Sequence, residues 1–196
     1  MIVKSAEFIT SAVQPHQYPP ADQPEIAFAG RSNVGKSSLI NKLVNRRRLV
    51  RTSRTPGRTR LINFFLINQT FRFVDLPGYG YAKVPANVQR QWGPMIETYL
   101  THRRGLHGLI LIVDIRRTPG PAEIDLLHWL DHHGIACRVV ATKTDKLSRN
   151  KQVRPARRIA EALGLGQDDL MLFSAKNGAG REAVWWSVAD MLGISP

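Results

Sequence analysis

The stretch GRSNVGKS, residues 30–37, decides the fold of this chain. It fits the pattern GxxxxGK[ST], in which a glycine-rich loop joins a strand to a helix. The sequence predicts a short buried strand over residues 25–29 before it and a helix over residues 36–45 after it, so both flanking elements have the required type. In such a loop backbone N–H groups surround phosphate oxygens, and the helix N-terminus adds partial positive charge. We therefore predict a phosphate-binding loop in which Lys36 reaches the β- and γ-phosphates and the Ser37 hydroxyl binds Mg²⁺.

A second motif, DLPG at residues 75–78, follows an expected hairpin strand and fits the pattern DxxG. Alone, this pattern is most often a turn. Here one hairpin separates it from the phosphate-binding loop, and this order predicts that Asp75 lies near the Mg²⁺ and that the Gly78 N–H faces the γ-phosphate. A threonine between the two motifs can complete the Mg²⁺ shell when a triphosphate is bound, and Thr59 is a better candidate than Thr55.

Two later motifs indicate which base is bound: TKTD at residues 142–145 and FSAK at residues 173–176. The Asp145 carboxylate can accept hydrogen bonds from N1–H and the exocyclic amine of guanine, whereas adenine lacks this pair of donors. The aliphatic stem of Lys143 can lie along the base. Thr142 stands where many GTPases carry asparagine, so one amide contact is absent or replaced by a hydroxyl. Together with the phosphate motifs, these stretches predict GTP rather than ATP as the ligand.

Basic residues are concentrated in one part of the chain. The 196 residues include 28 Lys and Arg against 15 Asp and Glu, a formal charge of +13. No acidic residue occurs from Ile26 to Val74, and eight basic residues lie close together there: Lys42, Arg46, Arg47, Arg48, Arg51, Arg54, Arg58 and Arg60. A block of one sign repels itself unless an anion binds it, so the pattern favours a polyanionic partner. A solvated face that keeps the chain soluble is the alternative.

The overall composition is that of a globular protein with one domain. Hydrophobic residues make up 43% and charged residues 22% of the chain. The longest aliphatic run, Leu109–Val113, is far shorter than the roughly 20 residues of a membrane span. The N-terminus lacks the pattern of a secretory signal, so we expect a cytoplasmic protein without a membrane partner. The single cysteine, Cys137, lies in an apolar run and is expected to be a buried, unreactive thiol.

Strand-like and helix-like segments alternate along the chain. Strands are expected at residues 25–29, 61–68, 71–74, 109–113, 137–142 and 170–173, and helices at 36–45, 86–102, 121–133, 151–163 and 181–192. Such alternation predicts a three-layer α/β/α fold with a six-stranded, mostly parallel sheet and about five helices; the hairpin adds one antiparallel strand. Residues 24–196 are expected to form the domain. Residues 1–23 are expected to form an N-terminal arm, in which residues 2–9 are either a short strand or part of the arm.

The motifs together resemble those of one bacterial family. GRSNVGKSSLIN, RTSRTPGRTRLINFF, DLPGYGYAKV, TKTD and FSAK are similar to the EngB family of GTPases, also called YihA or YsxC, which belongs to a wider group with TrmE, Era and EngA. The match runs from about Glu25 to Leu192. The resemblance implies a Ras-like G domain, GTP hydrolysis, a role in assembly of the large (50S) ribosomal subunit, and a link to cell division and septation. Arg60 departs from the family, where glutamine is common.

The resemblance also implies a set of site residues. The expected nucleotide contacts are Gly30, Arg31, Ser32, Asn33, Val34, Gly35, Lys36, Ser37, Ser38, Gly57, Arg58, Thr59, Arg60, Leu61, Asp75, Leu76, Pro77, Gly78, Thr142, Lys143, Thr144, Asp145, Phe173, Ser174 and Ala175. Of these, Lys36, Thr59 and Gly78 are assigned to catalysis. Ser37 and Thr59 are the expected Mg²⁺ ligands, Asp75 acts through water, and Asn33 is a possible K⁺ ligand or a turn residue. Tyr79 follows DLPG where many GTPases place a water-orienting glutamine, so slow intrinsic hydrolysis is expected.

Several functions fit a phosphate-binding loop. We expect a monomeric, Mg²⁺-dependent switch that binds GTP or GDP and a precursor of the large ribosomal subunit through its rRNA. A P-loop kinase is a second hypothesis, but it would need a lid and an acceptor site and would not need TKTD. A regulatory GTPase that acts on protein partners in cell division, without RNA, is a third. Tyr79 and Tyr81 are expected either to stack on a base or to pack within their own loop.

Overall fold

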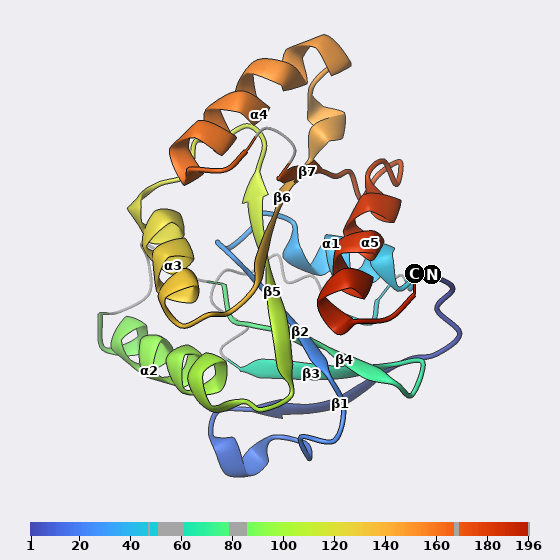
Figure 1. The fold of residues 1–196 in the computed structure, drawn as a ribbon, viewed down its shortest axis with the longest axis vertical. Helices are drawn as coiled ribbons and strands as arrows, with labels where there is room; N and C mark the ends of the chain where they lie inside the picture. Colours follow the sequence, from blue (N-terminus) through green and yellow to red (C-terminus); the bar gives the residue numbers. More distant parts are fainter. Residues whose placement is uncertain (47, 51–60, 79–85, 167–168, 196) are drawn as a thin grey trace.

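A seven-stranded sheet in the order β1-β3-β4-β2-β5-β6-β7 organises the part of the chain that the structure describes (Figure 1). The computed structural model describes residues 1–46, 48–50, 61–78, 86–166 and 169–195, with backbone only at 86–92. The strands are β1 Ala6–Ala12, β2 Glu25–Gly30, β3 Ile62–Ile67, β4 Phe71–Asp75, β5 Leu106–Asp114, β6 Cys137–Thr142 and β7 Leu170–Leu172. The helices are α1 Lys36–Leu43, α2 Ala86–His102, α3 Pro121–His132, α4 Arg149–Leu163 and α5 Arg181–Leu192, with 3₁₀ turns η1 Pro15–Gln17 and η2 Thr144–Lys146.

Helices cover both faces of the sheet (Figure 1). Residues of α2, α3 and α4 share one apolar core with the sheet, and residues of α1 and α5 share the other. The run LILIV within β5 is buried on both sides, as expected for the central strand of a parallel sheet. None of the helices among the described residues is long and apolar enough to cross a membrane.

The predicted fold class is confirmed: a mostly parallel sheet lies between two helical layers, and β3 is the strand that runs against the others. The strand count differs from the expected six because β1 pairs antiparallel with β3. β1 contains Phe8, Ile9 and Thr10, residues that favour strands, and the ring of Phe8 meets that of Phe65 edge to face, 5.7 Å between centroids. Part of the segment expected to be an N-terminal arm is therefore an edge strand. The domain boundary at residue 23 stays a prediction.

A buried ion-pair network holds the segment before β2 against the end of α2. Glu25 is fully buried and accepts hydrogen bonds from Arg103 Nε at 3.0 Å and from the Tyr99 hydroxyl at 2.9 Å. Arg103 also donates to the backbone oxygen of Pro19 at 2.9 Å, and Arg72 donates to that of Pro20 at 2.9 Å. Because these carbonyls belong to the proline-rich lead-in, the network fixes that segment to the sheet.

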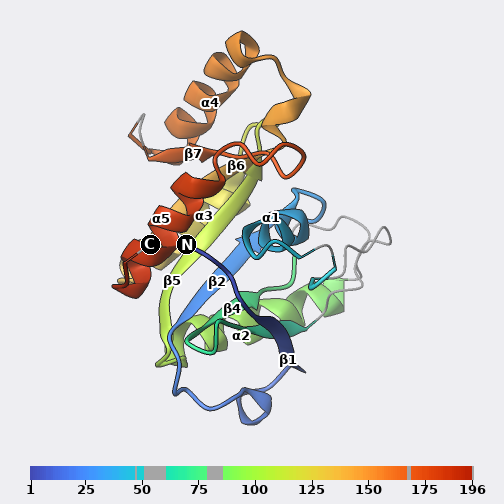
Figure 2. The same cartoon turned by 90° about the vertical axis from the view of Figure 1, so that its right-hand side faces the viewer.

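The parallel strands β2, β4, β5, β6 and β7 end at a common edge of the sheet. Figure 2 shows α4 next to β6 and β7, while β1 lies at the opposite side of the sheet. The motifs singled out in the sequence lie at the ends of β2, β4, β6 and β7 and in the loops that follow them. Ligands of open α/β sheets bind outside the carboxyl ends of the strands, so the candidate site lies here. Cys137 begins β6 away from this edge, and burial raises the pKa of its thiol to about 12, consistent with an unreactive cysteine.

Candidate functional site

The loop between β2 and α1 has the backbone geometry of an anion cradle. Asn33 and Gly35 take positive φ values, 65° and 107°, which turn the chain sharply before the helix. Gly35 caps α1, and no side chain forms a capping hydrogen bond there. Backbone N–H groups in the first turn of a helix lack intrahelical partners, so they remain available to an anion. Ser37 and Ser38 lie half-buried in this first turn.

Lys36 and Asp75 form a buried ion pair between α1 and the end of β4. Lys36 is 8% and Asp75 2% exposed, so each charge depends on the other for compensation. A lysine amine beside a helix N-terminus suits phosphate oxygens, and carboxylate and hydroxyl oxygens suit Mg²⁺. The donor set of Asp75 and Ser37, next to Lys36, therefore fits a Mg²⁺–nucleotide complex.

The DLPG loop packs directly against the phosphate-binding loop. A Cβ atom at Gly78 would lie 2.9 Å from Ser32 Oγ and 3.3 Å from Ser32 N, so the close approach favours glycine. Leu76 and Pro77 are buried, and Leu76 N donates to the Phe28 oxygen at 3.1 Å. The two predicted phosphate motifs thus meet in the structure.

The TKTD motif is tied to the phosphate-binding loop by two side chains. The Thr142 hydroxyl lies within hydrogen-bond reach of the backbone oxygens of Val34 and of Val113, the latter at 3.0 Å. The amine of Lys143 donates to the Asn33 oxygen. The Thr142 hydroxyl, which stands where many GTPases carry an asparagine amide, therefore joins β6 to the phosphate-binding loop and to β5.

Asp114, at the end of β5, is a site residue that the motif search missed. Its Oδ2 lies 3.0 Å from Lys143 Nζ. Arg116 donates from Nε to Oδ1 at 2.9 Å and from a terminal nitrogen to Oδ2 at 2.7 Å. Burial alone would raise the pKa of this carboxyl, but the hydrogen bonds from Arg116 and Lys143 hold it well below its usual range. Asp114 is therefore an anion that holds the Lys143 amine in place. The sequence signal that could have identified Asp114 is an aspartate at the end of a buried parallel strand.

Asp145 is oriented by Ser174. The Ser174 hydroxyl donates to Asp145 Oδ1 at 2.7 Å, and its oxygen accepts from the backbone N–H groups of Lys176 and Asn177 at 3.2 and 3.4 Å. Ser174 is fully buried, so its hydroxyl supports Asp145 from inside the protein. The two motifs are also joined by the backbone, because Thr144 N donates to the Phe173 oxygen at 3.3 Å.

The remaining predicted site residues fall into two groups. Arg31 is exposed and reaches toward α3, where its Nε lies 3.9 Å from Glu123 Oε1; Leu61 lies at the surface before β3, and Ala175 is half-buried beside Ser174. Gly57, Arg58, Thr59 and Arg60, with Thr55, Tyr79 and Tyr81, lie outside the described residues.

Known proteins with the same motifs match this chain along almost its full length. A family model described as a 50S ribosome-binding GTPase matches residues 25–143. A probable GTP-binding protein EngB from Desulfatibacillum aliphaticivorans is 55% identical over 194 residues, covering 99% of this chain and 95% of the relative. One from Geotalea daltonii is 56% identical over 192 residues, covering 98% and 93%. The crystal structure of a probable GTP-binding protein EngB, 26% identical, superimposes with a TM-score of 0.71 over 86% of this chain and 98% of that one.

Proposed function

This chain belongs to the EngB family of GTP-binding proteins and has a GTPase domain, and we propose that it is a Mg²⁺-dependent switch that assists assembly of the large ribosomal subunit by binding its rRNA. One observation carries the proposal. The acid-free, cation-rich stretch from Lys42 to Arg60 adjoins the phosphate-binding loop of a chain whose family model is described as a 50S ribosome-binding GTPase.

The phosphate side of the site rests on Lys36, Ser37 and Asp75. We propose that the Lys36 amine leaves Asp75 and binds the β- and γ-phosphates of GTP. Ser37 and, through water, Asp75 then hold the metal. Mg²⁺, when bound, neutralises charge that builds on the phosphate oxygens. Gly78 presents its N–H to the γ-phosphate, and Thr59 completes the metal shell in the GTP state.

The base side rests on Asp145, whose carboxylate selects guanine. Lys143, held by Asp114, lies along the base, and the Ala175 N–H faces guanine O6. Tyr79 replaces the glutamine that would orient water, so hydrolysis is slow until a further group assists. A K⁺ ion held by Asn33 is our candidate for that group, because a cation beside the phosphates offsets the developing charge.

Ribosome binding rests on the basic stretch. Arg46 and Arg48 are exposed at the end of α1, and Arg46 is held in place by donation to the Lys4 oxygen at 3.1 Å. The stretch continues into the segment that contains Thr59, so a change in the phosphate site reaches the cations directly. RNA affinity would then follow the nucleotide state. We place the protein in the cytoplasm as a monomer, and a septation defect would follow from a poor supply of ribosomes.

The test is sedimentation with purified large ribosomal subunits in GTP, in GDP and without nucleotide. We expect the parent chain to bind most tightly in GTP. Alanine at Arg46, Arg47, Arg48 and Arg51 should weaken binding and reduce the slope of log affinity against log salt by about 3.6 for duplex phosphates. GTP affinity should stay unchanged, since the site residues are intact. Absence of binding in every nucleotide state would contradict the proposal and favour a GTPase that acts on protein partners.

A further inference from the structure

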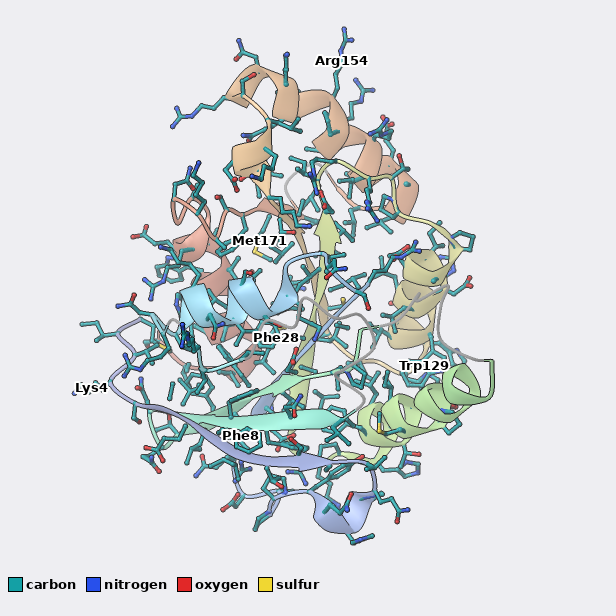
Figure 3. The ribbon with its side chains drawn as sticks, turned by 180° about the vertical axis from the view of Figure 1, so that it is seen from behind. Lys4, Phe8, Phe28, Trp129, Arg154 and Met171 are labelled. Atoms are coloured by element: carbon teal, nitrogen blue, oxygen red, sulfur yellow. The ribbon has the colours of Figure 1, made fainter. Side chains whose placement is uncertain are left out.

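Helix α4, Arg149–Leu163, lies at the end of the molecule where β6 and β7 end. Its Ile159 and Ala160 are buried, and it packs against α3 and β7. Figure 3 shows Arg154 on its outer face, directed away from the protein. The helix is therefore anchored by one face and presents the other to whatever meets this end.

Three cations share one outward stripe of α4. Lys151, Arg154 and Arg158 are all exposed. They are three and four residues apart, so they fall on the same side of the helix. With a rise of about 1.5 Å per residue, the stripe extends over about 10 Å of helix axis. A row of this length presents separated positive charges along a line.

Among the residues that the structure describes, no carboxylate pairs with the stripe. Arg157 pairs with Glu161 at 2.8 Å, but no carboxylate of the described residues lies within 4.0 Å of a charged nitrogen of Lys151, Arg154 or Arg158. Like charges three or four residues apart destabilise a helix. The first turn of α4 also has no acidic residue, so the positive end of the helix dipole adds to the field of the cations. Repulsion among these cations lowers the stability of α4, and a bound anion would offset it.

We propose that this stripe, Lys151, Arg154 and Arg158, binds RNA phosphates as a second contact surface. The proposal rests on the proposed function, because it takes the RNA to be that of the large ribosomal subunit. Phosphate contacts need separated cations and little apolar surface. Protein interfaces instead have apolar or aromatic centres and are poor in lysine. Val153 is the large apolar residue of α4 that is well exposed, and by itself it does not form such a centre.

The stripe and the described start of the basic stretch, Lys42, Arg46 and Arg48, lie on different sides of the sheet. The basic stretch starts at the end of α1, and α1 packs with α5 on one side of the sheet. Ile159 of α4 belongs to the core on the other side. One protein thus offers cations to two RNA segments, and only the stretch that begins at α1 continues into the Thr59 segment. We expect the α4 contact to be insensitive to nucleotide.

The test is a variant with glutamine at Lys151, Arg154 and Arg158. Its matched control has glutamine at Lys4, Arg104 and Arg117, three exposed cations of other segments, so both variants lose the same net charge. Binding to purified large subunits and to protein-free 23S rRNA is measured from 50 to 200 mM salt. We expect the magnitude of the slope of log affinity against log salt to fall by about 2.7 in the α4 variant only. The ratio of parent affinity to variant affinity should then be about 40-fold smaller at 200 mM than at 50 mM salt.

A third variant, with Lys151→Arg, Arg154→Lys and Arg158→Lys, keeps the charges and should bind as the parent does. GDP affinity should be the same in all four proteins. If the α4 variant matches the parent while alanine at Arg46, Arg47, Arg48 and Arg51 abolishes binding, the α4 surface is excluded and the proposed function stands. Equal weakening by the Lys4 control would show a general charge effect and overturn the proposal. Loss with subunits but not with protein-free rRNA would assign the surface to a ribosomal protein instead. A parent that binds neither probe overturns both proposals.

Discussion

Replacing Ser174 with alanine tests how the guanine side of the site is held. The Ser174 hydroxyl donates to Asp145 Oδ1 at 2.7 Å and is fully buried. A hydrogen bond to a charged group contributes about 1.5–3 kcal/mol. If Asp145 depends on this bond for its orientation, the loss appears in nucleotide binding, where about 1.4 kcal/mol corresponds to a tenfold change. The Ser174→Ala variant should bind GTP and GDP about 10- to 100-fold more weakly.

The two nucleotides should lose affinity equally, because both carry the same base. A fluorescent GDP analogue gives the dissociation constant and the dissociation rate directly, and unlabelled GTP gives its affinity by competition. Most of the change should appear as faster dissociation, since the binding loops remain open to encounter. Discrimination against ATP should also fall, because a mobile carboxylate no longer matches the donor pair of guanine.

Ser148→Ala is the matched control. Ser148 precedes α4, is exposed, and makes no capping hydrogen bond through its side chain. Its loss should leave GDP affinity within twofold of the parent. Unchanged affinity in Ser174→Ala would refute the argument that Asp145 needs this partner, and a similar loss in both variants would point to a general disturbance of this end of the sheet.

Three shorter predictions concern other charged side chains. Lys36→Ala should nearly abolish nucleotide binding and, because Asp75 is left buried without a cation, lower the free energy of unfolding of the nucleotide-free protein by about 3–5 kcal/mol in urea; equal stability would mean that the pair is not formed without nucleotide. Asp145→Asn should cost on the order of 2–3 kcal/mol of GTP affinity and improve XTP binding, measured by competition, and unchanged preference for GTP would remove Asp145 from base recognition. Glu25→Gln leaves Arg103 without its anion and should lower the free energy of unfolding by about 3–5 kcal/mol while sparing GDP affinity, so an unaltered urea midpoint would argue against the network.

The fold was predictable because its signals are local. Glycines at fixed spacing, a buried run such as that of β5, and helical periodicity each report on a few neighbouring residues. The sequence did not decide whether residues 2–9 form a strand or part of an arm, since the pairing of β1 depends on β3, at least 50 residues away along the chain. A strand whose partner is distant carries little signal of its own, and prolines follow β1 at Pro15 and Pro19.

Within the site, the motifs indicate candidate nucleotide contacts, whereas the residue that holds Lys143 in place belongs to no motif. The TKTD motif identifies Lys143 and Asp145, but Asp114 lies far from both along the chain and belongs to no motif. Only the pairing of β5 with β6 brings Asp114 to 3.0 Å from the Lys143 amine. The sequence likewise did not decide whether the asparagine amide contact is absent at Thr142 or replaced by its hydroxyl. The geometry gives the hydroxyl a separate task, the tie from β6 to the phosphate-binding loop.

A physical consequence follows from these supports. Asp145 is held from β7 by Ser174, Lys143 from β5 by Asp114, and Thr142 reaches the loop after β2 through the Val34 oxygen. Each side chain of the base motif is thus oriented by a different strand end. Rotating any one of these strands would misplace one base contact and leave the others intact. Guanine affinity should therefore respond in steps to changes in the sheet edge, and each step should trace to the one support that was changed.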